Sequence, residues 1–432
     1  MFQIQCRLWI LSISAILLLF IYNITLTLKL MYTPVCPKEN PVQRPTRIIY
    51  RKCTKDIAGL HHNDRIFNVD LNLGRWDERR KYKLFDNILI GDEYSTLGSS
   101  FKTCLASQSS VEKLPSIIEV SSHWNGPISL ATFAAYEDEL NALLMYILYL
   151  RKCDLGIRHK IAFHLALARE RRPKSFSIDL DRLETLDCGK PLEVLKDLIK
   201  DINKGPNKWR SKLPYPQNHL RNLARKNCQT KYIFLTDVDI IPSKEMAESL
   251  DVFLEKVDCK GQCAYVVPTY EVDERVVFPA NKTELVRLAN KGLARPFHHK
   301  VFIYNQYATN FTRWQNQVNE DSAVHVSHPV TNFEFLYEPF YIATDTVPPH
   351  DERFIGYGYT RNSQVYEMFV AGYEFLVLSP IFTCHWGLQV KRTRPPWREH
   401  QNNLNRKHFD GFKREIFAKY NKDPLNMMAR KT

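Results

Sequence analysis

The stretch KYIFLTDVDIIPS, residues 231–243, decides the fold. An apolar run leads into Asp237-Val238-Asp239, and apolar residues resume directly afterwards. An ionised carboxylate at the end of a buried strand is costly unless it is paired or holds a metal. Side chains two apart in an extended chain point the same way, so both carboxylates can reach one cation. We therefore expect a metal site at the end of a strand over 231–239.

The chain around this stretch alternates between strand-like and helix-like patterns. The expected elements are strand 101–109, helix 111–124, strand 126–136, helix 138–153, strand 159–168 and helix 218–228. Such alternation implies βαβ units and an α/β fold with a Rossmann-like, mixed but mostly parallel sheet. Ligands of these sheets bind at the carboxyl ends of the strands, where the two aspartates lie.

The pattern changes past residue 260, but no linker interrupts it. A strand is expected over 263–272 and a helix over 281–292, which would end at Gly292. We therefore expect residues 96–432 to form a single large domain.

The N-terminus predicts a membrane anchor. Residues 8–28 carry no charge over 21 positions, which is long enough for a helix to cross a bilayer. We expect a signal anchor here, with residues 1–7 as a cytosolic tail and 29–95 as a lumenal stem. A cleaved signal peptide is the alternative, although no clear cleavage site follows. With the signal anchor, the chain would be a single-pass type II membrane protein.

Two further features fit a lumenal location. The sequons at Asn281 and Asn310 are candidate glycosylation sites. The ten cysteines lack paired CxxC spacing, so a zinc cluster is not expected, and several should form disulfides in an oxidising lumen. Their connectivity is not readable from the sequence, although Cys259 and Cys263 are close enough to close a local loop.

The formal net charge of +13 suits an anionic partner, such as an acidic small molecule or a membrane surface, or simply a soluble basic surface. There is no zinc-finger spacing and no aromatic RNA-binding pattern, so we expect no nucleic-acid partner.

Asp237 and Asp239 suit Mn²⁺ or Mg²⁺, which prefer oxygen ligands. Such ions are usually held by one or two carboxylates together with substrate phosphates, which points to a phosphorylated donor such as a nucleotide sugar. His385 follows an apolar stretch and is the best third ligand; an imidazole favours Mn²⁺. A second Asp-x-Asp, at Asp179 and Asp181, lacks a preceding apolar strand and is rejected.

Three segments resemble glycosyltransferase family 49, and in particular its Golgi glucuronyltransferases of O-mannosyl glycan synthesis. They are GPISLATF, YPQNHLRNLARKNCQTKYIFLTDVDIIPS and HDERFIGYGYTRNSQVYEMFVAGYEFLVL, with His385 following. The resemblance covers about residues 100–390 and implies a GT-A fold, a UDP-glucuronate donor and Mn²⁺. It also implies inversion at the sugar to give a β-1,4 linkage, an acceptor glycan ending in xylose, and a place in the Golgi membrane. Copies of the chain or other Golgi transferases are further conceivable partners.

Inversion requires a base that deprotonates the acceptor hydroxyl. The candidates are Asp351 and Glu352, with Asp351 slightly preferred; the alternative is that either one merely pairs with Arg353 or another cation.

Donor contacts are expected from Asn218, Arg221 and Arg225, because guanidinium groups recognise carboxylates and phosphates. Arg221 and Arg225 share one helix face, and the alternative is that this face is only solvated. By fold analogy alone, Ser107 and Ser109 would lie near the uridine. Four aromatic residues could stack on sugars or belong to the core: Tyr357, Tyr359, Trp386 and Trp397.

Three alternative functions remain at this point. The first is the same fold with another donor, such as UDP-GlcNAc or UDP-xylose. The second is a catalytically inactive lumenal glycan-binding protein. The third, a two-metal hydrolase, would need more clustered ligands than the sequence offers.

Overall fold

The computed structural model describes residues 17–25 and 66–428, apart from 172, 174–175, 201, 203–212, 318–322 and 392–394. The chain divides into two units, Met1–Asp56 and Ile57–Thr432. In the first unit the described residues are the exposed helical segment 17–25, so most of the expected span 8–28 lies outside the description. No helix within the described ranges is both long and apolar enough to cross a membrane.

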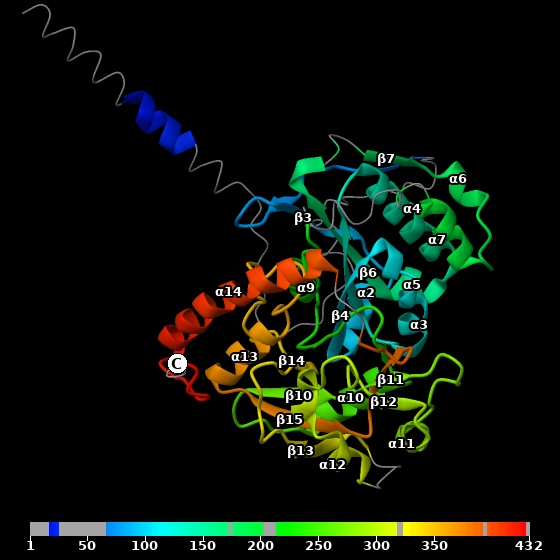
Figure 1. Ribbon diagram of the computed structural model, residues 1–432. Coiled ribbons are helices and arrows are strands. Elements are labelled where there is room, and N and C mark those ends of the chain that lie inside the picture. The colour runs from blue at the N-terminus through cyan, green and yellow to red at the C-terminus, as the bar shows by residue number, and fades with distance from the viewer. Residues whose placement is uncertain are drawn as a thin grey trace, which may run out of the picture. The chain divides into compact units, whose positions relative to one another are not determined.

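The second unit alternates strands and helices over most of its length (Figure 1). Its strands are β1 (Ile66–Val69), β2 (Arg75–Trp76), β3 (Tyr82–Leu89), β4 (Thr103–Ser110), β5 (Ile128–Ala134), β6 (Ile161–Ala168), β7 (Phe176–Asp179), β8 (Tyr232–Leu235), β9 (Ile241–Pro242), β10 (Cys263–Val267), β11 (Thr269–Val272), β12 (Ala294–Pro296), β13 (His325–Pro329), β14 (Phe340–Thr344), β15 (Glu374–Ser379) and β16 (Thr383–Trp386). Its α-helices are α2 (Tyr94–Ser100), α3 (Ser116–His123), α4 (Glu137–Cys153), α5 (Leu155–Lys160), α6 (Asp181–Glu184), α7 (Pro191–Ile199), α9 (Gln217–Lys226), α10 (Met246–Lys256), α11 (Lys282–Asn290), α12 (Phe311–Gln315), α13 (Asn362–Ala371) and α14 (Pro396–Tyr420).

The main sheet has ten strands in the order β13-β15-β10-β14-β8-β4-β5-β6-β3-β2. Its centre, β8-β4-β5-β6, is parallel, while β14 and β3 flank that centre in antiparallel orientation. The predicted mixed α/β sheet is thus confirmed. Read from β6 to β8 and numbered by their order in the chain, the four central strands follow the order 3-2-1-4. The sheet therefore grows in one direction from β4 to β6 and in the other direction from β4 to β8, which makes the boundary between β4 and β8 its switch point.

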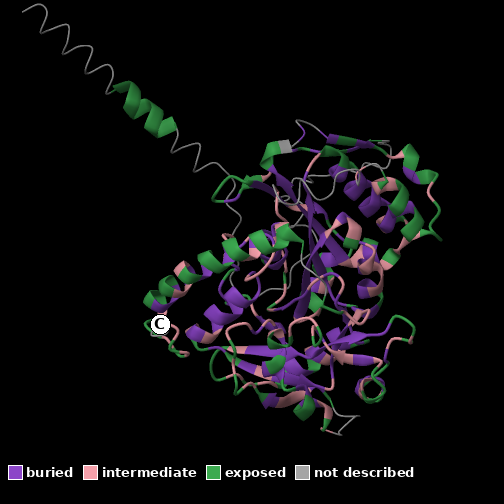
Figure 2. Cartoon of the chain, viewed as in Figure 1, coloured by how far each residue is buried: buried purple, intermediate pink, exposed green. Residues whose placement is uncertain are grey.

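Small and large side chains alternate along the central strands and separate two cores. Leu105, Leu130 and Phe163 pack in the larger core with the apolar side of α4. On the other face, Ala106 and Ala131 pack in a second core with α9. The alanines let the backbone of α9 approach the sheet closely. In Figure 2 the central strands are buried, whereas α14 presents exposed residues along much of its length.

The folded unit starts earlier than the predicted boundary at residue 95. β3 lies within the range assigned to the stem, yet it pairs with β6, with Tyr82 opposite Ala168. Tyr82 and Phe85 are both buried. Every residue of β3 is buried or half-buried, so the folded unit includes this part of the range assigned to the stem.

The expected strand 263–272 is two strands in different sheets. β10 joins the main sheet, whereas β11 joins a second sheet of order β12-β11-β16-β9. Pro268 lies between them, where the missing N–H lets the chain leave one ladder and enter the next. This second sheet carries His385 on β16.

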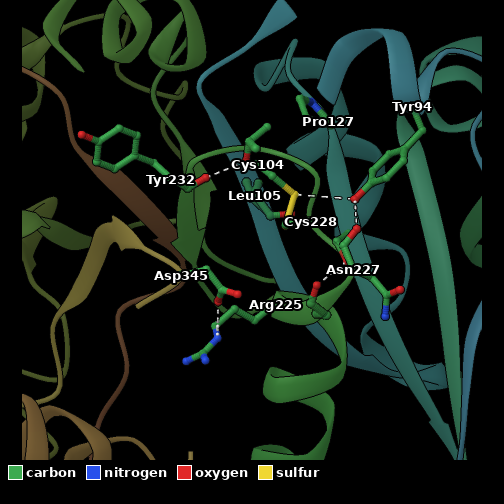
Figure 3. Close-up of a disulfide and its surroundings, with 12 residues drawn as sticks. Tyr94, Cys104, Leu105, Pro127, Arg225, Asn227, Cys228, Tyr232 and Asp345 are labelled. Carbon is green, nitrogen blue, oxygen red and sulfur yellow. Dashed lines mark hydrogen bonds and ion pairs between the residues drawn. A yellow bond between two sulfur atoms is a disulfide. The ribbon is translucent and has the colours of Figure 1, made fainter. Parts of the chain in front are cut away.

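Three disulfides occur in the described part of the chain: Cys104–Cys228, Cys153–Cys188 and Cys259–Cys263. The expected local loop at Cys259 is therefore closed. Figure 3 shows Cys104–Cys228 joining β4 to the chain just after α9, with Arg225 of that helix bound to Asp345.

Candidate active site

The two aspartates lie where the winding of the main sheet reverses. β8 ends at Leu235, and Asp237 follows beside the carboxyl end of the parallel neighbour β4. The expected extended geometry is wrong here, because the chain turns: the amide of Ile240 donates to the carbonyl of Asp237 at 3.0 Å. The turn sends the two carboxylates to different partners.

Two arginine side chains and one glutamine side chain bind the carboxylate of Asp237. Its Oδ1 accepts hydrogen bonds from Arg221 Nη2 at 3.3 Å and Gln108 Nε2 at 3.1 Å, and it forms an ion pair with Arg361 Nη2 at 2.8 Å. Burial opposes ionisation, but the two guanidinium charges outweigh it and hold the pKa of Asp237 well below its usual range. All three groups contact the same oxygen, Oδ1, and none of them contacts Oδ2.

Asp239 faces His385 and Lys113. Its Oδ2 lies 3.6 Å from His385 Nε2 and 3.1 Å from Lys113 Nζ. Burial tends to raise the pKa of Asp239, but His385 and then Lys113 lower it below the ordinary value. The structure thus brings together the predicted pair of Asp239 and His385, from a turn after β8 and from β16.

These residues fit a divalent cation by their donor chemistry. Asp237 Oδ2, the Asp239 carboxylate and the His385 imidazole are oxygen and nitrogen donors of the kind that Mn²⁺ accepts. His298 brings a second imidazole to this region, since its ring stacks on Phe297 at 3.9 Å and the Phe297 ring lies 5.6 Å from the His385 ring. Burial and His385 lower the pKa of His298 to about 4, so its ring is neutral at physiological pH.

Two cavities adjoin this region. The large cavity, of about 1390 Å³, is lined in part by Lys113, Asp239, Asp273, Glu274, Arg275, Tyr357, His385, Trp386, Lys391, Arg398 and Glu399. The small cavity, of about 180 Å³, is lined in part by Ser110, Phe133, Tyr215, Gln217, Tyr357, Trp397 and Arg398. Tyr357 and Arg398 border both, and Arg398 lies over the Tyr357 ring at 5.1 Å.

The predicted donor-binding helix is basic but not solvated. Arg221 and Arg225 are 4% and 6% exposed. Arg221 reaches Asp237, whereas Arg225 binds Asp345 Oδ1 at 2.7 Å and the Pro348 carbonyl at 2.9 Å. Asn218 donates to the Asp351 carbonyl at 2.8 Å. Neither Arg225 nor Asn218 lines either cavity, so both support the segment 345–351.

The two serines predicted as donor contacts on β4 lie on the face of the sheet opposite to the candidate site. Ser107 and Ser109 are buried and line neither cavity. Gln108 and Ser110 point to the opposite face, because side chains alternate along a strand. Gln108 contacts Asp237 and accepts from the Tyr215 hydroxyl, and Ser110 lines the small cavity.

The two predicted base candidates are engaged elsewhere. Asp351 accepts from the amide and guanidinium of Arg353, which is the alternative given for it above. Glu352 accepts from Asn222 Nδ2 at 3.0 Å and lies 3.5 Å from His219 Nε2. Neither carboxylate lines the large cavity.

Sequence reasoning missed the loop that follows β11. Asp273, Glu274 and Arg275 line the large cavity with Asp239 and His385. The signal was present, because TYEVDER repeats the pattern of an apolar-rich strand that ends in acidic residues.

The aromatic candidates divide between cavities and core. Trp386 lines the large cavity, Trp397 the small one and Tyr357 both, whereas Tyr359 packs on Phe409 at 5.1 Å. The sequon residues Asn281 and Asn310 are both exposed, and each caps a helix through its side-chain oxygen.

Comparison with known proteins places the chain in a family. The family model described as "Glycosyl-transferase for dystroglycan" matches residues 102–421. Human beta-1,4-glucuronyltransferase 1 is 34% identical over 331 residues, covering 74% of this chain and 76% of that protein. Its zebrafish (Danio rerio) counterpart is 32% identical and covers 81% and 83%. Human xylosyl- and glucuronyltransferase LARGE1 is 25% identical and covers 81% of this chain and 38% of that protein.

Among solved structures, GalNAc-T7 with UDP, GalNAc and Mn²⁺ aligns over 74% of this chain and 50% of that chain, at 8% identity and a TM-score of 0.38. That likeness is too low to carry an argument, so the assignment rests on the sequence matches. The chain belongs to the family described as glycosyltransferases for dystroglycan, and it is a glycosyltransferase.

Proposed function

We propose that this chain transfers glucuronate from UDP-glucuronate to a glycan with inversion at the sugar, giving a β-1,4 linkage. The observation that carries the proposal is the placement of Asp239 and His385 on the wall of a large cavity that adjoins a smaller aromatic one. The names of the relatives at 32–34% identity support glucuronate as the sugar.

The cavity pair suits a UDP sugar by size and charge. Aromatic residues of the small cavity, such as Phe133 and Tyr215, suit a flat base. Arg398 borders both cavities, so a cation is present where a diphosphate would cross from one cavity to the other. Lys113 adds a cation in the large cavity, at Asp239. Arg275 and Lys391 add further cations for the acidic sugar.

Asp237, Asp239 and His385 would hold a divalent cation, Mn²⁺ or alternatively Mg²⁺, which supplies positive charge for the departing UDP. This chain's own residues prepare that site. Arg221 and Arg361 fix Asp237 as an anion, and β16 positions the His385 ring against Asp239.

The acceptor in this proposal is a terminal xylose of an O-mannosyl glycan, in the Golgi lumen. The three disulfides and two exposed sequons support an oxidising, glycosylating compartment. The predicted anchor over 8–28 would hold the enzyme to the membrane as a type II protein.

The test is transfer by the Ile57–Thr432 unit from a panel of UDP sugars to a β-xyloside, with Mn²⁺ and then with chelator. UDP-glucuronate should be used in preference to UDP-xylose and UDP-GlcNAc. Asp239→Asn should lower transfer by about 10²-fold or more, because one carboxylate of the cation site is lost. The rejected copy provides the control, since Asp179→Asn should leave transfer unchanged.

Other outcomes would redirect the assignment. Preference for UDP-xylose or UDP-GlcNAc would change the donor and keep the site. UDP binding without transfer from any donor to any glycan tested would favour an inactive glycan-binding protein.

A further inference from the structure

We propose that Glu274 is the general base that deprotonates the acceptor hydroxyl. The inference rests on the proposed function, since a base is required only if the chain transfers a sugar with inversion. It replaces Asp351 and Glu352 in that role.

The strand pairing puts Glu274 beside the candidate cation site. β11 runs parallel to β16, with Glu271 opposite His385 and Val272 opposite Trp386. The ladder continues one step, because the amide of Gly387 donates to the Val272 carbonyl at 2.7 Å. Neighbouring strands lie about 4.8 Å apart, so the loop after β11 leaves the sheet next to His385.

Gly387 shows how closely the Glu274 side chain lies over this strand end. Gly387 has a φ of +90°, and a Cβ built there would lie 2.9 Å from Glu274 Oε1. The Glu274 carboxylate therefore rests on the backbone two residues beyond His385. Both residues line the large cavity.

The carboxylates on the described wall of the large cavity differ in how free they are to accept a proton. They are Asp239, Asp273, Glu274 and Glu399. Asp239 is assigned to the cation. Asp273 is held by Arg275 through Nε at 2.8 Å and Nη2 at 2.6 Å, so its oxygens are occupied.

Glu399 and Glu274 stand on different parts of the wall. Glu399 lies in the first turn of α14, next to Arg398 at the junction with the small cavity, which is the donor side. Glu274 is exposed and, within the described residues, forms no hydrogen bond or ion pair. An unpaired carboxylate facing solvent is the one that can take a proton from an arriving hydroxyl.

The step balances without a further reactant. The acceptor oxygen attacks C1 of the glucuronate from the face opposite UDP while its proton moves to a Glu274 oxygen. The bond between C1 and the β-phosphate oxygen breaks, and its electron pair leaves with UDP. Configuration at C1 inverts, and Glu274 later returns the proton to water.

The test compares Glu274→Gln with Glu352→Gln in the Ile57–Thr432 unit. Glu274→Gln should lower kcat for glucuronate transfer by about 10² to 10⁴-fold. Its Kd for UDP with Mn²⁺, measured by calorimetry, should stay at the wild-type value, because the donor and cation sites are untouched. Glu352→Gln should retain wild-type transfer, because the Glu352 carboxylate lines neither cavity.

A second measurement separates the role of a base from a structural one. Glu274→Ala should recover part of its transfer rate when formate is added, because a small carboxylate can fill the vacated space and accept the proton. Glu399→Ala should show no such recovery.

The outcomes distinguish this inference from the proposed function. A Glu274→Gln enzyme within about tenfold of wild type overturns the base assignment while wild-type transfer still stands. A loss of transfer in step with a loss of UDP binding also overturns it, since Glu274 would then serve the donor. Wild-type protein that transfers no glucuronate overturns the proposed function, and the base with it.

Discussion

The tripeptide Asp-Glu-Arg occurs at 77–79, 273–275 and 351–353. The copies at 273–275 and 351–353 have closely related local geometry. In both copies the third-position amide donates to the aspartate Oδ1, at 3.0 Å in the first and 2.8 Å in the second. In both, the arginine Nη2 reaches Oδ2 at 2.6 Å. We call these the cavity copy and the buttressed copy.

Their surroundings differ completely. The cavity copy follows β11, lines the large cavity and leaves Arg275 83% exposed. In the buttressed copy, Glu352 is held by Asn222 and His219 of α9, and Arg353 also binds Glu415 of α14. The Asp–Arg pair is therefore the same in these two copies, and the tertiary neighbours decide whether the glutamate is free for chemistry.

The comparison predicts that the buttressed copy matters for stability. Asn222→Ala removes three hydrogen bonds: those to Glu352 and to the His350 carbonyl, and that from the His350 amide. We expect the free energy of unfolding to fall by about 2–3 kcal/mol, because buried partners are left unsatisfied. Chemical denaturation of the Ile57–Thr432 unit measures this.

Asn403 supplies the control, because it is exposed on α14. Asn403→Ala should change the free energy of unfolding by less than about 0.5 kcal/mol. Equal effects of the two substitutions would break the distinction between the copies.

The residue before each tripeptide sharpens the comparison through pH. The cavity copy is preceded by Val272, whereas the buttressed copy is preceded by His350, which is 1% exposed. Burial, then the charges of Arg221, Arg361 and Arg225, hold the pKa of His350 well below its ordinary value. Below about pH 6.5, His350 therefore binds a proton in the unfolded chain but not in the folded chain.

Stability should thus fall as the pH drops from about 6.5, with a slope of up to about 1.4 kcal/mol per pH unit from this group. His350→Gln should flatten the dependence by that amount, measured as the free energy of unfolding between pH 7 and pH 5. If the slope is unchanged in His350→Gln, His350 does not cause the loss of stability at low pH.

The smallest expected effect comes from deleting the same arginine in each copy. Arg353→Ala breaks contacts to both Asp351 and Glu415 and should cost about 1 kcal/mol of unfolding free energy, because a bidentate network is lost. Arg275→Ala should leave the melting temperature unchanged, since Arg275 is almost fully solvated. Denaturing the two variants under the same conditions shows whether the Asp–Arg pair contributes equally to the free energy of unfolding in both copies.

Much of the central fold was predictable because its signals are local. The expected helix 138–153 is α4, Glu137–Cys153, and the expected helix 218–228 is α9, Gln217–Lys226. Alternation of such elements sufficed to predict a mixed α/β sheet with parallel central strands.

The errors arose where long-range contacts decide. β3 is recruited into the main sheet by β6, almost eighty residues later in the chain, and no local pattern announces that pairing. The turn at Asp237 is fixed by the partners of the two aspartates rather than by strand propensity.

The site was predictable in part for the same reason. Asp237, Asp239 and His385 stand at the ends of apolar runs, and strand ends are where ligands of such sheets bind. The choice between the cavity copy and the buttressed copy was not predictable, because it depends on α9 and α14 lying against one copy and open space lying beside the other.

The disulfides have a consequence for the order in which the protein is made. Cys153–Cys188 lies wholly inside the stretch closed by Cys104–Cys228. A ribosome delivers the cysteines in chain order, so Cys104 meets Cys153 and Cys188 before its own partner exists. Pairing by first encounter would therefore give the wrong bridges. Correct maturation requires Cys104 to stay reduced until residue 228 has emerged, or a later exchange catalysed by a thiol–disulfide isomerase.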